Sequence, residues 1–136
     1  MQYITQRNGR GSGLRLLIVD DNEEITDGIT YYLGTDQTID CEVTNDGPQG
    51  LERIRNDKFD LILLDLAMPD FSGFDIVKSL KQDGLLESKN IVIFTASTDQ
   101  RLFDEMKKAG IKDIFKKPFS INDLTALIDK YRPKTK

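Results

Sequence analysis

The sequence has 136 residues, a length that fits one domain able to bury a core of its own. Its formal net charge of −4 gives no electrostatic footprint for nucleic acid, and the absence of histidine excludes Ser-His-Asp and Cys-His catalysis, histidine-ligated zinc and a histidine phospho-carrier. The single cysteine, Cys41, excludes an intramolecular disulfide, and no apolar run approaches the roughly 20 residues of a membrane span, so we expect a cytoplasmic protein.

The N-terminal segment 1–13 is polar and glycine-rich, which does not resemble a signal peptide. A phosphate-binding glycine loop follows a strand and opens a helix, whereas these glycines precede the first predicted strand. We therefore expect a flexible leader or linker over 1–13, a folded domain over 14–131 and a basic, frayed tail over 132–136.

Five apolar runs suited to strands alternate with five amphipathic helical segments. Runs of four aliphatic residues, as at Leu61–Leu64, are typical of strands buried on both faces of a parallel sheet. Strict alternation with short connections predicts an α/β fold, a three-layer sandwich around a five-stranded parallel sheet. The expected strands are Leu14–Val19, Ile39–Thr44, Phe59–Leu64, Ile91–Phe94 and Ile111–Lys116, and the expected helices are about Glu23–Leu33, Pro48–Arg55, Ser72 to a break at Gly84, Asp99–Ala109 and Ser120–Tyr131.

Two details of this pattern carry further expectations. Ile39–Thr44 has mixed polarity, which favours an edge position in the sheet. Asp21 and Glu24 have the spacing of a capping box, so Asp21 has a purely structural interpretation as a helix cap. That interpretation does not account for its neighbour Asp20.

Residues able to bind a metal or a phosphate follow four of the five predicted strands. They are Asp20 with Asp21, Asp65, Thr95 and Lys117. In open α/β sheets, ligands bind beyond the carboxyl ends of the strands. Two carboxylates about 5 Å apart repel by roughly 3 kcal/mol at an effective dielectric constant of about 20, so three acids beside one lysine favour a bound cation. Mg²⁺ fits such oxygen ligands, with Mn²⁺ as an alternative.

Taken in order, these motifs resemble the receiver domain of two-component response regulators. The resemblance covers about Leu14–Tyr131, and four motifs, each placed after its strand, are specific in combination. The motifs are Asp20-Asp21, Asp65-Leu66-Ala67-Met68-Pro69 with Gly73, Thr95-Ala96 and Lys117-Pro118-Phe119.

The resemblance implies a flavodoxin-like, CheY-like fold with strand order 2-1-3-4-5. It implies that Asp65 is the phospho-acceptor and that Asp20, Asp21, Asp65 and the backbone carbonyl of Ala67 hold Mg²⁺. Thr95 and Lys117 would bind the phosphoryl group, with a Lys-Pro bond that is commonly cis in this family. The donor would be a sensor histidine kinase or phosphotransfer protein. The domain would not be an enzyme acting on other molecules; it would catalyse only its own phosphorylation and its own slow dephosphorylation.

One position departs from the family pattern. An aromatic residue usually stands three positions before the lysine, and here Ile114 occupies that place, with Phe115 next to it. Isoleucine is β-branched and stiff, and it has no ring to swing between two positions. Ile114 has two interpretations. It is simply a core residue of the fifth strand, or its presence means that signalling uses movement of the fourth helix as Thr95 shifts instead of rotation of an aromatic ring.

The same resemblance implies a partner surface and two tuning positions. Output would pass through the fourth helix, the fifth strand and the fifth helix, with no contact to nucleic acid or membrane by this domain. Ala67 and Ser97 stand where the family tunes the access of water to the phosphoryl group. Four basic residues would give this partner surface a cationic character: Arg101, Lys107, Lys108 and Lys112. The alternative is that they form an ordinary solvated surface with no partner.

Three other functions can be compared with the receiver-domain interpretation. A haloacid-dehalogenase type of hydrolase needs a second aspartate two positions after the nucleophile, where this chain has Ala67. A flavoprotein of the same strand order would have Ser, Thr and Gly after the first strand, where this chain has Asp20-Asp21-Asn22. A receiver-like binding module that is not phosphorylated is disfavoured, but not excluded, by Asp65, Thr95 and Lys117.

Overall fold

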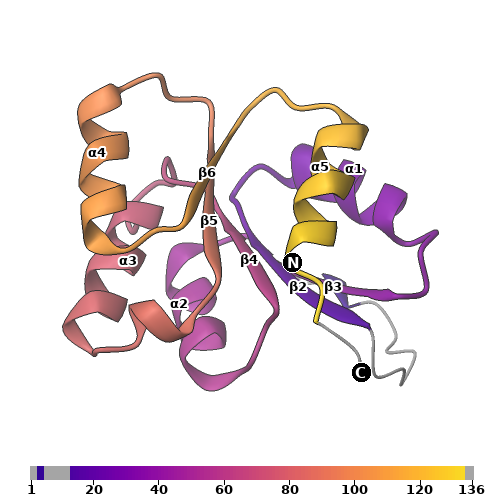
Figure 1. Cartoon of the computed structure of the whole chain (residues 1–136), viewed down its shortest axis with the longest axis horizontal. Helices are drawn as coiled ribbons and strands as arrows, with labels where there is room; N and C mark the ends of the chain where they lie inside the picture. Colours follow the sequence, from indigo (N-terminus) through magenta and orange to yellow (C-terminus); the bar gives the residue numbers. More distant parts are fainter. Residues whose placement is uncertain (1–2, 5–12, 134–136) are drawn as a thin grey trace.

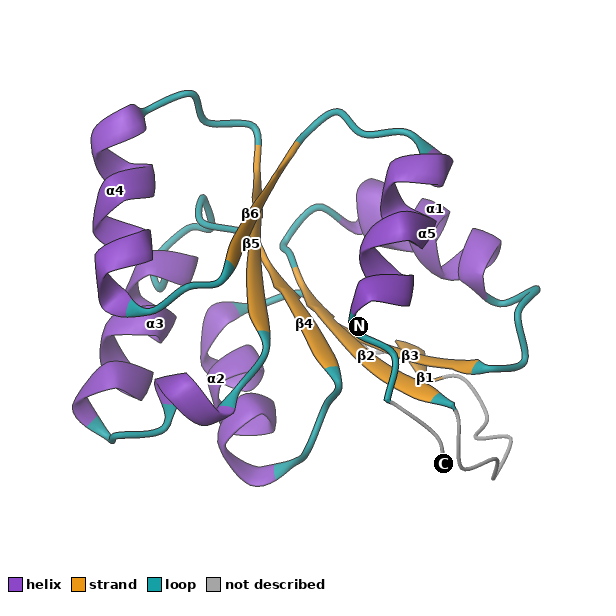
Figure 2. Ribbon diagram, in the orientation of Figure 1, coloured by secondary structure: helices purple, strands orange, loops and turns teal. Residues whose placement is uncertain are grey.

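The computed structural model describes residues 3–4 and 13–133, and its elements form three layers (Figure 1). Helices α1 and α5 cover one face of the sheet, and α2, α3 and α4 cover the other (Figure 2). The elements are β1 Tyr3–Ile4, β2 Leu14–Val19, α1 Glu23–Leu33, β3 Ile39–Thr44, α2 Gly47–Asn56, β4 Leu61–Leu64, α3 Gly73–Gln82, the short 3₁₀ helix η1 Leu86–Ser88, β5 Ile91–Thr95, α4 Gln100–Ala109, β6 Asp113–Lys116 and α5 Ile121–Lys130.

Five of the strands are parallel and lie in the order β3-β2-β4-β5-β6. This confirms the predicted fold and the 2-1-3-4-5 order. A sixth strand, β1, pairs antiparallel with β3. The prediction that Ile39–Thr44 forms the edge is therefore wrong, and all six of its residues are buried. Its polar residue Glu42 tolerates burial because Arg15 and Arg53 both form ion pairs with its carboxylate.

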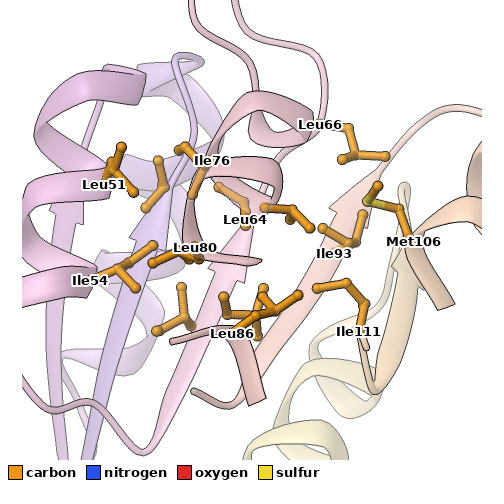
Figure 3. Close-up of a cluster of buried hydrophobic side chains, with 14 of the residues drawn as sticks. Leu51, Ile54, Leu64, Leu66, Ile76, Leu80, Leu86, Ile93, Met106 and Ile111 are labelled. Carbon is orange, nitrogen blue, oxygen red and sulfur yellow. The ribbon is translucent and has the colours of Figure 1, made fainter. Parts of the chain in front are cut away.

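The two faces of the sheet carry separate hydrophobic clusters, because successive side chains of a strand point to opposite sides. In β4, Ile62 and Leu64 join the cluster beneath α2, α3 and α4, part of which Figure 3 shows. Leu61 and Leu63 join the cluster beneath α1 and α5. Within the described ranges, no helix is both long enough and apolar enough to cross a membrane.

Several expected boundaries need correction; Ile111, for example, lies before β6 and not within it. Phe59 lies outside β4, and its ring instead packs 4.6 Å and 5.5 Å from the guanidinium carbons of Arg15 and Arg53. Arg132, expected to begin a frayed tail, is anchored: its guanidinium donates to Thr38 Oγ1 at 3.0 Å and to Asp36 Oδ2 at 3.4 Å. Most of the expected leader lies outside the described residues, as do 134–136 of the tail.

Helix α3 begins against the backbone of Asp65, and this close approach requires Gly73. A Cβ atom on Gly73 would lie 2.1 Å from the Asp65 carbonyl oxygen. We expect Gly73→Ala to destabilise the fold by about 1–3 kcal/mol, since backbone must move to admit the methyl group. Urea denaturation followed by circular dichroism measures the change.

Gly28 is the matched control, because a Cβ atom there meets nothing within 4 Å. It lies inside α1, so Gly28→Ala should stabilise the fold by about 0.5–1 kcal/mol. Equal effects of the two substitutions would contradict the steric argument.

Candidate functional site

The register of the sheet places Asp20 and Asp65 side by side. Val19 pairs with Leu64 on the adjacent strands β2 and β4, and each aspartate follows its strand directly. The Asp65 amide continues the pairing by donating to the Val19 carbonyl at 2.9 Å. Neither aspartate is solvated, because Asp20 has no exposed surface and Asp65 is only 5% exposed.

Lys117 and Thr95 reach the same end of the sheet from β6 and β5. The Lys117 ammonium lies 2.8 Å from Asp20 Oδ2 and 3.7 Å from Asp65 Oδ1. Its backbone amide donates to the Thr95 carbonyl at 2.8 Å, and the Lys117–Pro118 peptide is cis, as expected. Thr95 is buried, and its hydroxyl oxygen accepts from the Ser97 amide at 3.1 Å. Figure 2 shows the loops after β5 and β6 leaving the sheet at this common end.

Asp21 completes an acidic cluster with Asp20 and Asp65. One carboxylate oxygen from each residue can be chosen so that all three lie within 4.8 Å of one another. The expected capping role of Asp21 is wrong, because Asn22 is the N-cap of α1 and its side chain accepts from the Ile25 amide. The spacing of Asp21 and Glu24 therefore suggested the wrong cap, and the observed cap leaves Asp21 exposed beside the buried acids.

The electrostatics of the cluster favour a cation. Burial, followed by repulsion from Asp20, raises the pKa of Asp65 to about 6, although Lys117 acts in the opposite direction. One ammonium does not neutralise three neighbouring carboxylates. These oxygen donors therefore fit a hard divalent ion such as Mg²⁺, which binds through a few carboxylates and retains water.

Three contacts around the site were not found from the sequence. The amide of Asn45 donates to the Asp20 carbonyl at 2.8 Å, across 25 positions of sequence. The Lys117 ammonium lies 4.2 Å from the centroid of the Phe94 ring, a cation–π distance. The Ala67 amide donates to Asp65 Oδ1 at 3.3 Å. Of these three contacts, only the one between Ala67 and Asp65 joins residues close in sequence. A turn directly after the strand would have predicted it.

Ile114 and Phe115 lie on opposite faces of the sheet. Ile114 packs against the cluster beneath α2, α3 and α4. Phe115 packs against the cluster beneath α1 and α5, with its ring centroid 4.9 Å from that of Phe119. Phe115 therefore cannot take the place of the usual aromatic residue without leaving its own cluster.

The two expected tuning positions border the site. Ala67 is exposed next to Asp65, and Ser97 is half-buried next to Thr95. The Ser97 hydroxyl oxygen also accepts from the Asp99 amide at 3.1 Å, which joins the loop after β5 to the start of α4. The influence of both residues on water remains a prediction.

Removal of the Asp65 charge should stabilise the folded chain in the absence of metal. Because the pKa of Asp65 is raised on folding, the folded state binds its proton more tightly than the unfolded state does. The wild-type protein therefore loses stability relative to Asp65→Asn as the pH rises from about 4 to 6.

Above pH 6, in the presence of a chelator, we expect Asp65→Asn to be more stable by about 1–3 kcal/mol. Urea denaturation between pH 4 and pH 8 tests this, with the exposed Asp27→Asn as a control for loss of a surface carboxylate. A constant difference across that range would contradict the raised pKa.

Comparison with known proteins identifies the family. Residues 16–129 match the family described as response regulator receiver domain. The chain is 33% identical over 116 residues to the response regulator ArlR of Staphylococcus saprophyticus, covering 84% of this chain and 50% of that protein. It is 31% identical over 125 residues to hybrid signal transduction histidine kinase G of Dictyostelium discoideum, covering 90% of this chain and 4% of the kinase.

Solved structures agree with this match. The receiver domain of Francisella response regulator 1452 superposes with a TM-score of 0.77 at 27% identity, covering 88% of this chain and 96% of that one. The chemotaxis protein CheY4 of Vibrio cholerae superposes with a TM-score of 0.76 at 26% identity, covering 88% of this chain and 98% of that one. The chain spans half or less of the two curated relatives named above. With nearly all of its described residues matched, the chain belongs to the response regulator receiver domain family.

Proposed function

We propose that this domain accepts a phosphoryl group on Asp65 in a reaction that depends on Mg²⁺, and that the donor is a phosphohistidine of a partner kinase or phosphotransfer protein. The observation that carries the proposal is the contact of one ammonium, Lys117, with two buried carboxylates, Asp20 and Asp65. Such a pocket has an acceptor, a counter-charge and a metal-binding edge at one place. Family membership adds the class of reaction.

Each residue then has a defined role. An oxygen of Asp65 attacks phosphorus in line with the bond to the donor nitrogen; the P–O bond forms as the P–N bond breaks, and the imidazole leaves. Lys117 offsets charge on the phosphoryl oxygens, and the Thr95 hydroxyl donates a hydrogen bond to one of them. The residues that would hold Mg²⁺ are Asp20, Asp21, Asp65 and, through its backbone carbonyl, Ala67; the ion would supply positive charge to offset that of the reacting oxygens.

A groove beside Lys117 offers a place for the donor protein to dock. It has a volume of about 580 Å³ and lies between α1 and the segment that follows β6. Ile25, Ile29, Phe119 and Ile121 line it, and Ile121 is 40% exposed. An apolar surface next to the acceptor suits a helix that presents a phosphohistidine.

Output is proposed to pass through α4, β6 and α5. Four basic side chains are exposed on α4 and on the segment that enters β6, which suits an acidic partner: Arg101, Lys107, Lys108 and Lys112. The cytoplasm is the proposed location, consistent with a sequence that has a single cysteine, the buried Cys41.

Acetyl phosphate with Mg²⁺ tests the phosphotransfer. We expect a mass gain of roughly 80 Da on the wild-type chain, lost in Asp65→Asn, because a single carboxylate accepts the group. Mass spectrometry of the intact protein measures it, with Asp46→Asn on a neighbouring turn as a control that retains the gain. No gain from acetyl phosphate or from a histidine kinase would favour a binding module that is not phosphorylated.

The position of Ile114 gives a second test. Since Phe115 packs on the face opposite to α4, we expect its ring to keep one rotamer while resonances of α4 shift on activation. NMR spectra of the free and beryllofluoride-bound protein measure both. A Phe115 ring that exchanges between buried and exposed positions would contradict signalling without an aromatic rotamer change.

A further inference from the structure

We propose that Asn45, on the turn between β3 and α2, is a positioning residue that holds the loop Asp20–Asn22 in the shape required to bind a divalent cation. The inference rests on the metal binding proposed above, and it adds a residue from outside the four motifs. Asn45 touches neither the acidic side chains nor the phosphoryl pocket in any contact described here. Its influence would pass through the backbone of the loop.

The contacts of Asn45 join the two ends of this loop. Its Nδ2 atom donates to the Asp20 carbonyl at 2.8 Å, where the loop leaves β2. The same Nδ2 atom lies 3.3 Å from Thr26 Oγ1, in the first turn of α1. Asp20 and Thr26 are both fully buried. One amide group therefore connects the strand end and the helix start between which Asp21 and Asn22 lie.

The chemistry of the acceptors fixes the orientation of the amide. The Asp20 carbonyl can only accept, so the nitrogen of Asn45 must face it. The Thr26 hydroxyl donates to backbone carbonyls of its own helix, 3.2 Å from Glu23 O, which leaves a lone pair for the second Asn45 proton. The Asn45 Oδ1 atom is buried with no hydrogen-bond partner among the described residues. Because an unpaired buried acceptor is unfavourable, the two donated bonds must hold the side chain in place.

The loop in turn directs the carboxylates. The Asn22 amide donates to Asp20 Oδ1 at 2.9 Å, while Lys117 contacts the other oxygen of the same carboxylate. Asp21 follows Asp20 directly in the same loop, so the backbone that the Asn45 contact restrains also positions Asp21. Fixing the Asp20 carbonyl therefore restrains both acidic residues at once.

The two donated bonds are the property to remove in a test. An aspartate at position 45 would lose both bonds, but its negative charge would itself attract a cation and mask the loss. Alanine and leucine lose the bonds without adding charge, and leucine also keeps about the same side-chain size. Asparagine supports a cation site here through its two donors.

Magnesium titration of the intact chain by isothermal calorimetry tests the proposal. We expect the Mg²⁺ dissociation constant to rise about tenfold or more in Asn45→Ala and in Asn45→Leu, as for other residues that orient metal ligands. In acetyl phosphate labelling, the Mg²⁺ concentration for half-maximal rate should rise by a similar factor. The maximal rate at saturating Mg²⁺ should change little, because the reacting groups are intact.

Asn90 provides the matched control, since its Nδ2 atom makes the same type of contact elsewhere. It donates to the Asp60 carbonyl at 3.1 Å, just before β5 and far from the carboxyl ends of the strands. Asn90→Ala should lower resistance to urea yet leave the Mg²⁺ dissociation constant unchanged. If Asn45→Ala is poorly folded, the size-matched Asn45→Leu and the removal of one acceptor in Thr26→Val separate the lost contacts from loss of the fold.

The outcomes distinguish this proposal from the function on which it rests. A wild-type dissociation constant in both Asn45 variants, or an equal rise in Asn90→Ala, overturns the positioning role and leaves the proposed function standing. Failure of the wild-type chain to bind Mg²⁺ overturns the metal dependence itself, and the positioning role with it.

Discussion

The ammonium of Lys117 lies between two buried carboxylates, and the rest of the site depends on this contact. At 2.8 Å from Asp20 and 3.7 Å from Asp65, it reduces the repulsion that two adjacent acids would otherwise exert. It does not restore an ordinary carboxyl group, since burial, followed by repulsion from Asp20, still raises the pKa of Asp65. The pocket is therefore stable enough to fold and still electrostatically suited to a further cation.

The sheet makes this arrangement possible because parallel strands end at a common edge. Adjacent strands lie about 4.8 Å apart, so residues that follow paired positions are close without any special loop. Asp20 and Asp65 meet in this way after β2 and β4. Lys117 comes from β6, two strands beyond β4, and its long side chain crosses the end of β5 over the Phe94 ring.

The two faces of the sheet carry different features. The α1 and α5 face carries the apolar groove beside Lys117, which includes Phe119, and it also carries Phe115. The α4 face carries Ile114 and the cluster in Figure 3 that contains Met106 and Ile93. Isoleucine at position 114 has no ring to rotate, so the signalling proposed above would depend on movement of the backbone and of α4.

The sequence by itself determined the five parallel strands and the side chains that follow them, because uninterrupted aliphatic runs and helical periodicity are local properties. The order of the strands followed only from the resemblance to receiver domains. The sequence also placed Asp20, Asp65, Thr95 and Lys117 at one end of the sheet, although their roles in phosphotransfer remain proposals. The tertiary structure decided that β1 pairs with Glu42 and Val43 of β3 and that Asn22 caps α1. It also decided the contacts of Asn45 and Arg132, which reach partners 25 and 94 positions away. Such contacts depend on which segments pack together and on the direction of single side chains, and no local pattern of residues encodes either.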